Sequence, residues 1–418
     1  MSELSYLEKL LDGVAIEWKM LGDMAEIYDG THQTPKYINS GIPFVSVQNI
    51  KNLYATDKFV SAEDFEKYKC KPRTNDFFMT RIGDVGTCAI VENDEPLAYY
   101  VTLALIRANQ GVVLPKFIMY IIESGIGKAE LYKRTLIHAV PMKINLGEIG
   151  KIVIPIPCPD NPEKSLAIQS EIVRILDKFT ALTAELTAEL TMRKKQYNYY
   201  RDQLLSFDDV EVEWKTLGDV TKKWYSGGTP TAGKAEYYEN GDIPWLRTQE
   251  VKFSDINSTE IKITQAALKN SAAKWIPENC VIIAISGATA GRSAINKIPL
   301  TTNQHCGCLE IDDTKALYRY VFHWVSFNYE NIKSLGQGAR GDLNSTIIKN
   351  FKLPIPYATD PDKSLKEQAR IVEILDKVDT LTNSITEGLP REIELRQKQY
   401  EYYRDLLFSF PRPDVAEA

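Results

Sequence analysis

The chain has 418 residues, enough for two or three domains with complete hydrophobic cores, and its 44% apolar and 25% charged residues are typical of a globular protein. No stretch approaches the ~20 apolar residues that span a bilayer, and the first eleven residues do not resemble a signal peptide. The formal net charge of -6 is opposite to that of most nucleic-acid-binding domains. A nucleic-acid-binding hypothesis therefore requires local basic surfaces and a partner that supplies part of the positive charge.

The chain begins with a short amphipathic segment, residues 6–11, that resembles residues 200–205 and 403–407 of the same chain. This similarity predicts that residues 1–15 form a helical tail that completes a repeated unit and packs beside the C-terminal helix. An amphipathic helix without that role is the alternative.

The rest of the chain consists of two halves with the same beginning and the same end. The opening Glu-Trp-Lys-x-Leu-Gly-Asp of residues 17–23 recurs at residues 213–219. The exit Pro-Ile-Pro of residues 155–157 recurs at residues 354–356, an offset of 199 residues (354 minus 155). The halves diverge strongly between these ends, which indicates one scaffold that carries two binding modules for different targets.

Both variable regions are rich in β-branched and aromatic residues, with frequent Gly, Pro and Asn, and this composition predicts short strands joined by loops. The expected strands are residues 42–47, 88–91, 151–155 and 281–285, and the expected helices are residues 116–123 and 315–329. Each region is therefore predicted to be an α+β module.

Each half ends in a long helical pattern. Apolar residues at steps of three and four predict one uninterrupted helix over residues 165–205, roughly 60 Å long at ~1.5 Å per residue. A second pattern covers residues 371–407 and should be broken or kinked by the Gly-Leu-Pro of residues 388–390. Because so long a helix needs a partner, we predict that the two pack antiparallel as a coiled coil. The predicted helix–helix contact residues are Ile172, Phe179, Leu182, Leu186, Leu190, Ile371, Val378, Leu381 and Ile385.

The predicted fold class is α+β: two α+β modules joined and spaced by two long antiparallel helices, with pseudo-two-fold symmetry. The expected domains are the helical tail at residues 1–15, the first module at 16–158, the central helical spacer at 159–207, the second module at 208–357, the C-terminal helical spacer at 358–410 and a flexible tail at 411–418.

Two local motifs suggest chemistry that the surrounding residues do not support. Residues 228–234 match the phosphate-binding pattern G-x-x-x-x-G-K, but Ala235 lacks the hydroxyl that a magnesium ion needs and Pro230 removes an amide donor. His305, Cys306 and Cys308 suggest zinc, but no second ligand pair stands at finger spacing. We predict no metal and no cofactor, and the scattered cysteines indicate reduced thiols in a cytosol.

Polar and basic side chains recur at matching places in the two modules. A strand with the pattern Ile-Pro ends in Gln, Asn or Arg, which have the geometry to bind base edges, and a Lys suited to phosphate follows. Glycine-rich loops follow later in each module. For any single residue, bonding to local loop amides is an equally good interpretation. The candidate contact residues of the first module are Thr31, His32, Gln33, Thr34, Lys36, Ser46, Gln48, Asn49, Lys51, Arg81, Thr87, Lys143 and Asn145. Those of the second module are Thr229, Thr231, Lys234, Arg247, Gln249, Lys252, Thr289, Arg292, Asn303, Gln304, Gln337, Arg340 and Asn344.

No set of nucleophile and base, or of clustered acids, recurs in the two halves, and the chain has only four His. The Asp-Pro-Pro-Tyr type of motif for amino-group methylation is absent, as are a Walker pair and a dinucleotide-binding fingerprint. The sequence therefore predicts a binding protein without catalytic residues of its own.

These motifs resemble, over the whole chain, the specificity subunits of type I restriction–modification enzymes, and the Thr-Ala-Glu-Leu tandem at residues 183–190 resembles their type IC group. The match includes the Gly-Thr-Pro turn, the Gly-Ala-Thr-Ala-Gly-Arg loop with Thr-Asn-Gln, and Gln169 or Gln368 near the start of each helix. The second module fits better, because the first loosens Gly-Thr-Pro to residues 30–35 and has Thr87 where the second has Arg292.

The resemblance implies a subunit that has no active site and binds no cofactor. It implies two target-recognition domains that each bind one half of a split double-stranded DNA target. It also implies two modification subunits that bind S-adenosylmethionine and methylate adenine N6, ATP-driven restriction subunits recruited through the complex, and no membrane.

Two other classes of function remain as alternatives. A stand-alone methyltransferase or nuclease would carry catalytic motifs, which this sequence lacks. A coiled-coil scaffold that binds only proteins would show no salt-dependent affinity for duplex DNA.

Overall fold

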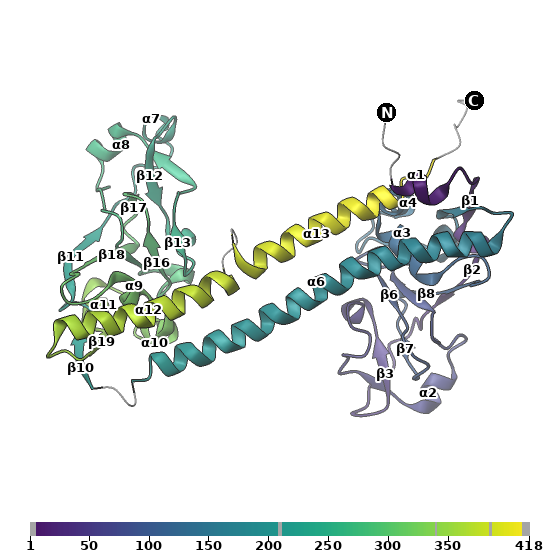
Figure 1. The fold of residues 1–418 in the computed structure, drawn as a ribbon, viewed down its shortest axis with the longest axis horizontal. Coiled ribbons are helices and arrows are strands. Elements are labelled where there is room, and N and C mark those ends of the chain that lie inside the picture. Colours follow the sequence, from purple (N-terminus) through teal and green to yellow (C-terminus); the bar gives the residue numbers. More distant parts are fainter. Residues whose placement is uncertain (1–5, 208–210, 339–340, 384–386, 412–418) are drawn as a thin grey trace. The chain divides into compact units, whose positions relative to one another are not determined.

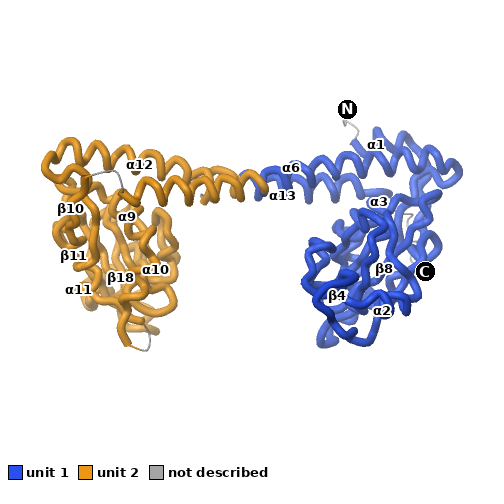
Figure 2. The backbone as a smooth tube through the Cα atoms, turned by 90° about the horizontal axis from the view of Figure 1, so that it is seen from below, with its two compact units in different colours: residues 1–187, 392–418 blue, residues 188–391 orange. Residues whose placement is uncertain are grey.

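The computed structural model describes residues 6–207, 211–338, 341–383 and 387–411. The chain divides into two compact units (Figure 2). Unit 1 comprises residues 1–187 and 392–418, and unit 2 comprises residues 188–391. Each unit therefore combines one variable region with helical segments from two distant parts of the sequence. No helix among the described residues is both long and apolar enough to cross a membrane.

Unit 1 builds its module from three sheets (Figure 1). The four-stranded sheet has the order β2-β8-β5-β6, the three-stranded sheet β4-β3-β7 and the two-stranded sheet β1-β9. The strands are β1 (Ile16–Met20), β2 (Ala25–Asp29), β3 (Ile42–Val45), β4 (Phe59–Val60), β5 (Phe77–Thr80), β6 (Cys88–Ile90), β7 (Ala98–Tyr99), β8 (Leu103–Ala108) and β9 (Val153–Pro157). The helices are α1 (Tyr6–Leu11), η1 (Leu21–Asp23), η2 (Val47–Asn49), α2 (Ala62–Glu66), α3 (Pro115–Glu123), α4 (Gly125–Arg134), α5 (Leu146–Gly150) and the first part of α6 (Pro162–Leu204).

Unit 2 repeats this architecture with a five-stranded sheet, β11-β18-β15-β16-β13, a three-stranded sheet, β14-β12-β17, and the pair β10-β19. The strands are β10 (Val212–Thr216), β11 (Thr221–Ser226), β12 (Ile243–Leu246), β13 (Asp255–Ile256), β14 (Ile261–Ile263), β15 (Val281–Ala284), β16 (Ser293–Asn296), β17 (Thr301–Thr302), β18 (Cys306–Ile311) and β19 (Lys352–Pro356). The helices are α7 (Ala235–Tyr238), η3 (Thr248–Glu250), α8 (Gln265–Asn270), η4 (Gly287–Thr289), α9 (Tyr318–Phe327), α10 (Tyr329–Ser334), α11 (Ser345–Asn350) and α12 (Pro361–Asn383). The α+β prediction is confirmed.

The repeated ends of the two halves pair with each other. In unit 1 the opening strand β1 is antiparallel to the exit strand β9, with Trp18 opposite Pro155. In unit 2, β10 and β19 pair in the same register, with Trp214 opposite Pro354. The first and last strands of each variable region are therefore paired with each other through constant residues. The sequence between these two strands can change without moving the start of the long helix that follows the last strand.

A buried glutamine fixes each long helix to its own module. The Gln169 side chain is fully buried; its Oε1 accepts a hydrogen bond from Leu114 N at 2.9 Å and its Nε2 donates to Val112 O at 3.1 Å. Gln368 repeats both bonds with Leu317 N at 2.9 Å and Lys315 O at 3.4 Å. Burying a primary amide is favourable only when its hydrogen bonds are made, so the glutamine specifies the docking geometry.

An aspartate two turns further along makes a second contact that differs between the units. Asp177 accepts hydrogen bonds from Tyr120 Oη at 2.6 Å and Lys116 Nζ at 2.8 Å, whereas Asp376 bonds His323 Nε2 at 2.6 Å and pairs with Arg319. Burial raises the pKa of Asp376, but the hydrogen bonds from His323 and Arg319 outweigh burial and leave that pKa below its ordinary value. The helix keeps its aspartate while each module supplies its own partners.

Each unit also buries the end of a helix that starts in the other half of the sequence. The unit 1 core contains Leu407, Phe408 and Phe410, which follow or end α13 (Gly388–Leu407), together with residues 168–176 of α6. The unit 2 core contains Leu205 and Phe207, at the end of α6, together with Ile371 and Leu375 of α12. The helices run antiparallel within unit 1, because Phe179 stacks on Tyr403 at 5.5 Å while earlier residues of α6 meet later ones near the C-terminus.

The predicted N-terminal tail also docks in unit 1. Leu7 and Leu11 of α1 are buried in the same core as Phe408 and Phe410, and Tyr6 Oη donates a hydrogen bond to Glu171 on α6 at 3.1 Å. The tail is therefore more than an amphipathic helix on the surface, which favours the prediction that it packs beside the C-terminal helix.

The predicted helix contacts differ in how well they are covered. Ile172 and Ile371 are buried, but they contact the cores of their own modules. Leu186, Leu190 and Val378 are half-buried. Leu182 and Leu381, at equivalent positions, are each 36% exposed, so these two side chains are only partly covered. Ile385 lies outside the described residues. The predicted break is confirmed, since α12 ends at Asn383 and α13 begins at Gly388 with φ of 77°.

We expect Gln169→Ala to lower the free energy of unfolding by about 1–3 kcal/mol, because it leaves the Leu114 amide and the Val112 carbonyl buried without a partner. Urea unfolding measures the loss, and hydrogen exchange should accelerate over residues 112–118. The control is Gln203→Ala, which removes an exposed glutamine from the same helix. Equal effects of the two substitutions would contradict the anchoring role.

Candidate nucleic-acid interface

The candidate residues of unit 2 gather at one edge of its five-stranded sheet. The end of β11, the start of β18 and the end of β15 lie side by side, since Ser226 pairs with Gly307 and Ala284 pairs with Cys306. The loops that continue from these strand ends carry candidate residues, and the chain after β12 joins them through the bond from Asn303 N to Leu246 O. We call this set of loops, residues 227–234, 247–252, 285–292, 303–305, 336–338 and 341–344, the loop edge of unit 2.

Polar side chains of neighbouring loops are bonded to one another along this edge. Thr229 Oγ1 donates to Gln304 Oε1 at 2.7 Å, and Gln304 Nε2 lies 3.2 Å from His305 Nε2. His305 Nδ1 lies 2.6 Å from Ser286 Oγ. A Cβ at Gly227 would overlap the carbonyl oxygen of Thr302, so only glycine lets the first loop pass this close. The loops therefore hold one another in place and present an exposed row of donors and acceptors.

Arg247 is the most constrained basic candidate in unit 2. Its guanidinium pairs with Glu260 and lies 3.6 Å from Glu250, and the Gln249 side-chain oxygen accepts a hydrogen bond from it at 2.7 Å. Two carboxylates and an amide thus fix the fork of Arg247 next to the exposed Gln249. These partners already engage the guanidinium donors of Arg247 and hold Gln249 in place, and the exposed Gln249 amide is suited to binding a base edge.

The other unit 2 candidates differ in exposure. Thr231, Lys234, Lys252 and Gln337 are exposed, and Thr289 and Arg292 are half-buried. Asn303 is buried and its Oδ1 accepts from His305 N, so it positions the loop rather than facing outwards. Asn344 caps α11 by accepting from Ile347 N at 2.9 Å. Arg340 lies outside the described residues.

Unit 1 builds an equivalent loop edge from residues 30–41, 46–52, 81–87, 100–102 and 136–145. The end of β2 and the end of β5 lie on either side of the start of β8, since Asp29 pairs with Ala104 and Thr80 pairs with Leu103. Thr31 N donates to Tyr99 O, and Val47 N donates to Thr102 Oγ1 at 3.1 Å. The same strand ends therefore carry the candidate loops in both units.

The sequence predicts that Arg81 contacts phosphate or guanine directly, but the structure places its side chain inside the loop edge. The side chain is only 8% exposed, pairs with Asp29 and donates from Nε to Ile144 O at 3.3 Å. Asp29 in turn bonds His32 Nε2 at 2.8 Å. Because the charge of Arg81 is already neutralised inside the loop edge, its role is to tie three loops together. Sequence reasoning missed Asp29, since nothing in the spacing links a strand-end Asp to an Arg 52 residues away (81 minus 29).

Several other unit 1 candidates bond to neighbouring loop residues. Ser46 and Asn49 cap the turn η2 reciprocally, and Thr87 Oγ1 donates to Asp84 at 2.6 Å. Thr31 is half-buried. The exposed candidates are His32, Gln33, Thr34, Lys36, Gln48, Lys51, Lys143 and Asn145. Exposed lysines at the start, middle and end of the edge give it positive charge despite the acidic chain.

The two motifs with suspected chemistry have simpler structural explanations. Burial raises the pKa of the Cys306 thiol to about 12 and also raises that of the Cys308 thiol, which favours the neutral thiol for both. Within the described ranges no three His, Cys, Asp or Glu side chains are placed to hold a metal ion. The 228–234 turn leads into α7, a helix of four residues, with Pro230 buried. The sequence suggests His305 only as a metal ligand, whereas the structure places it among the polar residues of the loop edge.

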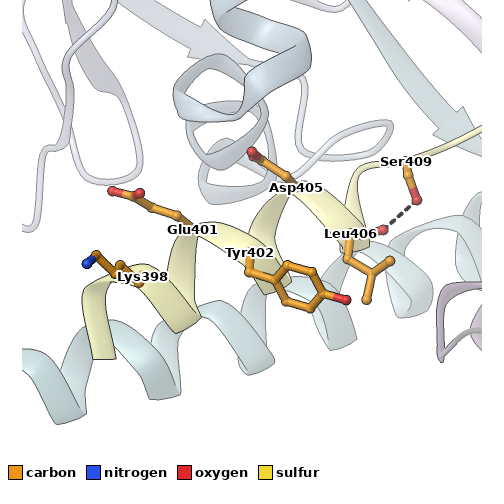
Figure 3. A pocket seen from close by; sticks show the side chains of 6 residues that line it. All are labelled: Lys398, Glu401, Tyr402, Asp405, Leu406 and Ser409. Carbon is orange, nitrogen blue, oxygen red and sulfur yellow. Dashed lines mark hydrogen bonds between the residues drawn. The ribbon is translucent and has the colours of Figure 1, made fainter. Parts of the chain in front are cut away.

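A shallow pocket lies on α13 in unit 1 (Figure 3). It is lined by Lys398, Glu401, Tyr402, Asp405, Leu406 and Ser409. Equivalent positions on α6, at an offset of 203 residues (398 minus 195), are occupied by Lys195, Asn198, Tyr199, Asp202, Gln203 and Ser206. Tyr402 and Tyr199 are 65% and 59% exposed. An exposed tyrosine is therefore present at equivalent positions of the two units, with matching Lys, Asp and Ser neighbours in the sequence and with Asn198 and Gln203 in place of Glu401 and Leu406.

The sequence matches the model of the type I restriction modification DNA specificity domain twice, over residues 15–192 and 209–395. The chain is 45% identical to the type I restriction enzyme EcoR124I/EcoR124II specificity subunit of Escherichia coli, covering 99% of both chains. It is 34% identical to the EcoprrI specificity subunit of Escherichia coli over 93% of both. The solved S subunit of a type I restriction-modification system from M. genitalium has the same fold, with a TM-score of 0.60 at 13% identity over 98% of this chain and 99% of that one.

Two domains of this family, each with a loop edge, define the class of DNA-recognition subunits. The chain belongs to the type I restriction–modification specificity subunit family. Subunits of this kind supply DNA recognition to the enzyme and are not catalytic themselves.

Lys143 and Arg81 should respond differently to substitution, because one is exposed and the other is buried in an ion pair. We expect Lys143→Ala to lower DNA affinity of the assembled complex and to reduce the slope of log affinity against log salt by about 1, as for the loss of one phosphate contact. Arg81→Ala should weaken binding through disordered loops, with faster hydrogen exchange at residues 29–34 and 143–145 and an unchanged slope. A reduced slope for Arg81→Ala would restore the direct-contact hypothesis.

Proposed function

We propose that each unit recognises one half of a bipartite double-stranded DNA target through its loop edge. One observation carries this proposal. The repeated strands pair in the same register in both modules, and two different sets of polar loops extend from equivalent strand ends. Bonded Gln and His side chains are suited to base edges, and exposed lysines are suited to phosphates. We propose that the candidate residues at these edges contact DNA, except Arg81 and Asn303, which position the loops.

The long helices set the gap between the two half-sites. α6 is continuous from Pro162 to Leu204 and contributes residues to both units. A helix advances by ~1.5 Å per residue and resists compression, so its length is suited to fix a separation. Domain boundaries follow from this division: modules at residues 16–158 and 208–357, and helical spacers at 159–207 and 358–410.

Two copies of one modification subunit dock on the surfaces around Tyr199 of α6 and Tyr402 of α13. Exposed tyrosines at equivalent positions support binding of two identical partners. Exposed aromatic residues are frequent anchors of protein interfaces. The partners bind S-adenosylmethionine, methylate adenine N6 and supply positive charge that this chain lacks, and ATP-driven restriction subunits join through the complex. Because its substrate is DNA, we propose that the complex acts in the cytoplasm.

The test of this function is a genome-wide map of N6-methyladenine after co-expression with a compatible modification subunit. The proposal expects one split motif, with two short constant halves and a fixed gap that keeps both halves within about one helical turn, ~34 Å, of each other. A contiguous motif would mean that only one unit recognises DNA. A stable complex that methylates nothing would favour the protein scaffold.

Deleting residues 187–190, one Thr-Ala-Glu-Leu unit of α6, should shorten the gap by about one base pair. The helix loses ~6 Å at ~1.5 Å per residue, which is less than two base pairs at ~3.4 Å each. Both half-site sequences should stay the same in the methylation map, because neither loop edge is altered. An unchanged gap would contradict the proposal that this helix sets the spacing between the half-sites.

Tyr199→Ala and Tyr402→Ala should each weaken binding of one modification subunit, by tenfold or more if the tyrosine is a central anchor. Native mass spectrometry should then show complexes with a single modification subunit for either variant and none for the double variant. Met192→Ala, which alters another exposed residue of α6 (67% exposed), is the control. Full stoichiometry in the double variant would place the docking surface elsewhere.

A further inference from the structure

Unit 1 exposes an apolar loop at its loop edge that the recognition of half-sites does not explain. Residues 136–142 connect α4 to α5, and the exposed fractions of Leu136, Ile137, Val140 and Met142 are 49%, 39%, 100% and 37%. Large apolar side chains gathered on a surface usually mark a binding site. We call residues 136–142 the apolar loop.

The apolar loop has a fixed base and therefore projects in a defined direction. Leu136 N donates to Lys143 O at 2.8 Å, which closes the loop, and Ala139 N donates to Leu136 O at 3.1 Å. Gly83 N donates to Met142 O at 2.9 Å, and Ile144 N donates to Arg81 O at 3.0 Å. The loop is thus bonded to the segment that holds Arg81, in the middle of the loop edge.

The charges around the apolar loop favour DNA as its partner. Residues 131–147 contain no Asp or Glu and include Lys133, Arg134, His138 and Lys143. Lys133 and Arg134 pair with Glu130 at 3.0 Å, which leaves His138 and Lys143 on either side of the exposed tip. An apolar tip flanked by the Lys143 ammonium and the His138 ring, both hydrogen-bond donors, is suited to a base step between two phosphate strands.

The sequence of unit 2 differs at the equivalent place, where residues 336–342 include no large apolar residue. Its loop between α10 and α11 carries the polar, glycine-rich sequence of residues 336–342, closed by bonds of 2.9 Å between Gln337 and Asp342 in both directions. The difference between two modules with the same frame indicates that the apolar loop serves the half-site of unit 1 and not the fold.

We propose that the apolar loop is a wedge that enters the DNA at the half-site bound by unit 1, with Val140 and Ile137 placed against or between bases so that one base step is unstacked and the duplex is kinked. Apolar wedges of this size unstack steps and bend DNA by roughly 20–90°. The inference rests on the proposed function and adds a specificity mechanism to it: steps that unstack easily are favoured even where no polar side chain contacts the bases.

The experiment uses the full chain assembled with its modification subunits and duplexes that carry the mapped target. 2-Aminopurine is placed at successive positions of both half-sites, leaving out the methylated adenine, because methyltransferases extrude their target base. The wild-type complex should raise the fluorescence at one step of a single half-site. Val140→Ser should abolish this rise and weaken binding about tenfold, as expected for the loss of one buried apolar side chain.

The control is Met20→Ser, an equally polar change at a half-exposed residue on β1, which leads into the opposite end of β2 from the loop edge. It should keep the fluorescence rise. A rise that persists in Val140→Ser and in Ile137→Ser/Val140→Ser, or site-specific binding by the wild type without any rise, overturns the wedge. Failure of Val140→Ser to assemble with the modification subunits overturns it in favour of protein docking. A wild-type complex without sequence-specific binding overturns the proposed function, and the wedge with it.

Discussion

The hydrogen bonds of one buried glutamine in each half hold the rest of the structure in place. Gln169 and Gln368 each join the first turns of a long helix to the loop that follows an interior strand of a module. The loop edge is at the other end of that same strand, β8 or β18. A single rigid strand therefore lies between the helix and the loops, and a helix that shifted or rotated would carry the loop edge with it.

This arrangement separates what must stay constant from what is free to vary. The paired strands β1-β9 and β10-β19 and the buried glutamine are built from the repeated residues. Loop-edge residues extend from strand ends and bond mainly to one another, and their exposed side chains cost little stability when they change. The buried pair of Arg81 with Asp29 is an exception, since in unit 2 the corresponding loop contacts are made by uncharged Thr229, Gln304 and Ser286. Each module thus organises its loops with its own polar network.

Exchange of helix ends between the halves adds a second constraint. Each module is completed by Phe or Leu side chains from the helix of the other half, so neither core is whole without a distant part of the chain. The buried aromatic residues Phe408 and Phe410 contribute apolar area that a module of this size needs. As a result, the helices that are proposed to set the gap are also part of the two folding units.

The sequence by itself determined the repeat, the α+β class, the long helix and its broken partner, because periodicity and breakers act over a few neighbouring residues. It also indicated which loops carry polar candidates. Only the tertiary structure decided that these loops meet at one edge, that Arg81 and Asn303 face inwards, that Leu182 and Leu381 are partly uncovered, and that residues 136–142 expose an apolar tip. Those outcomes depend on which strand ends lie side by side and which charges find partners across the fold, and a single sequence carries no record of such long-range pairings.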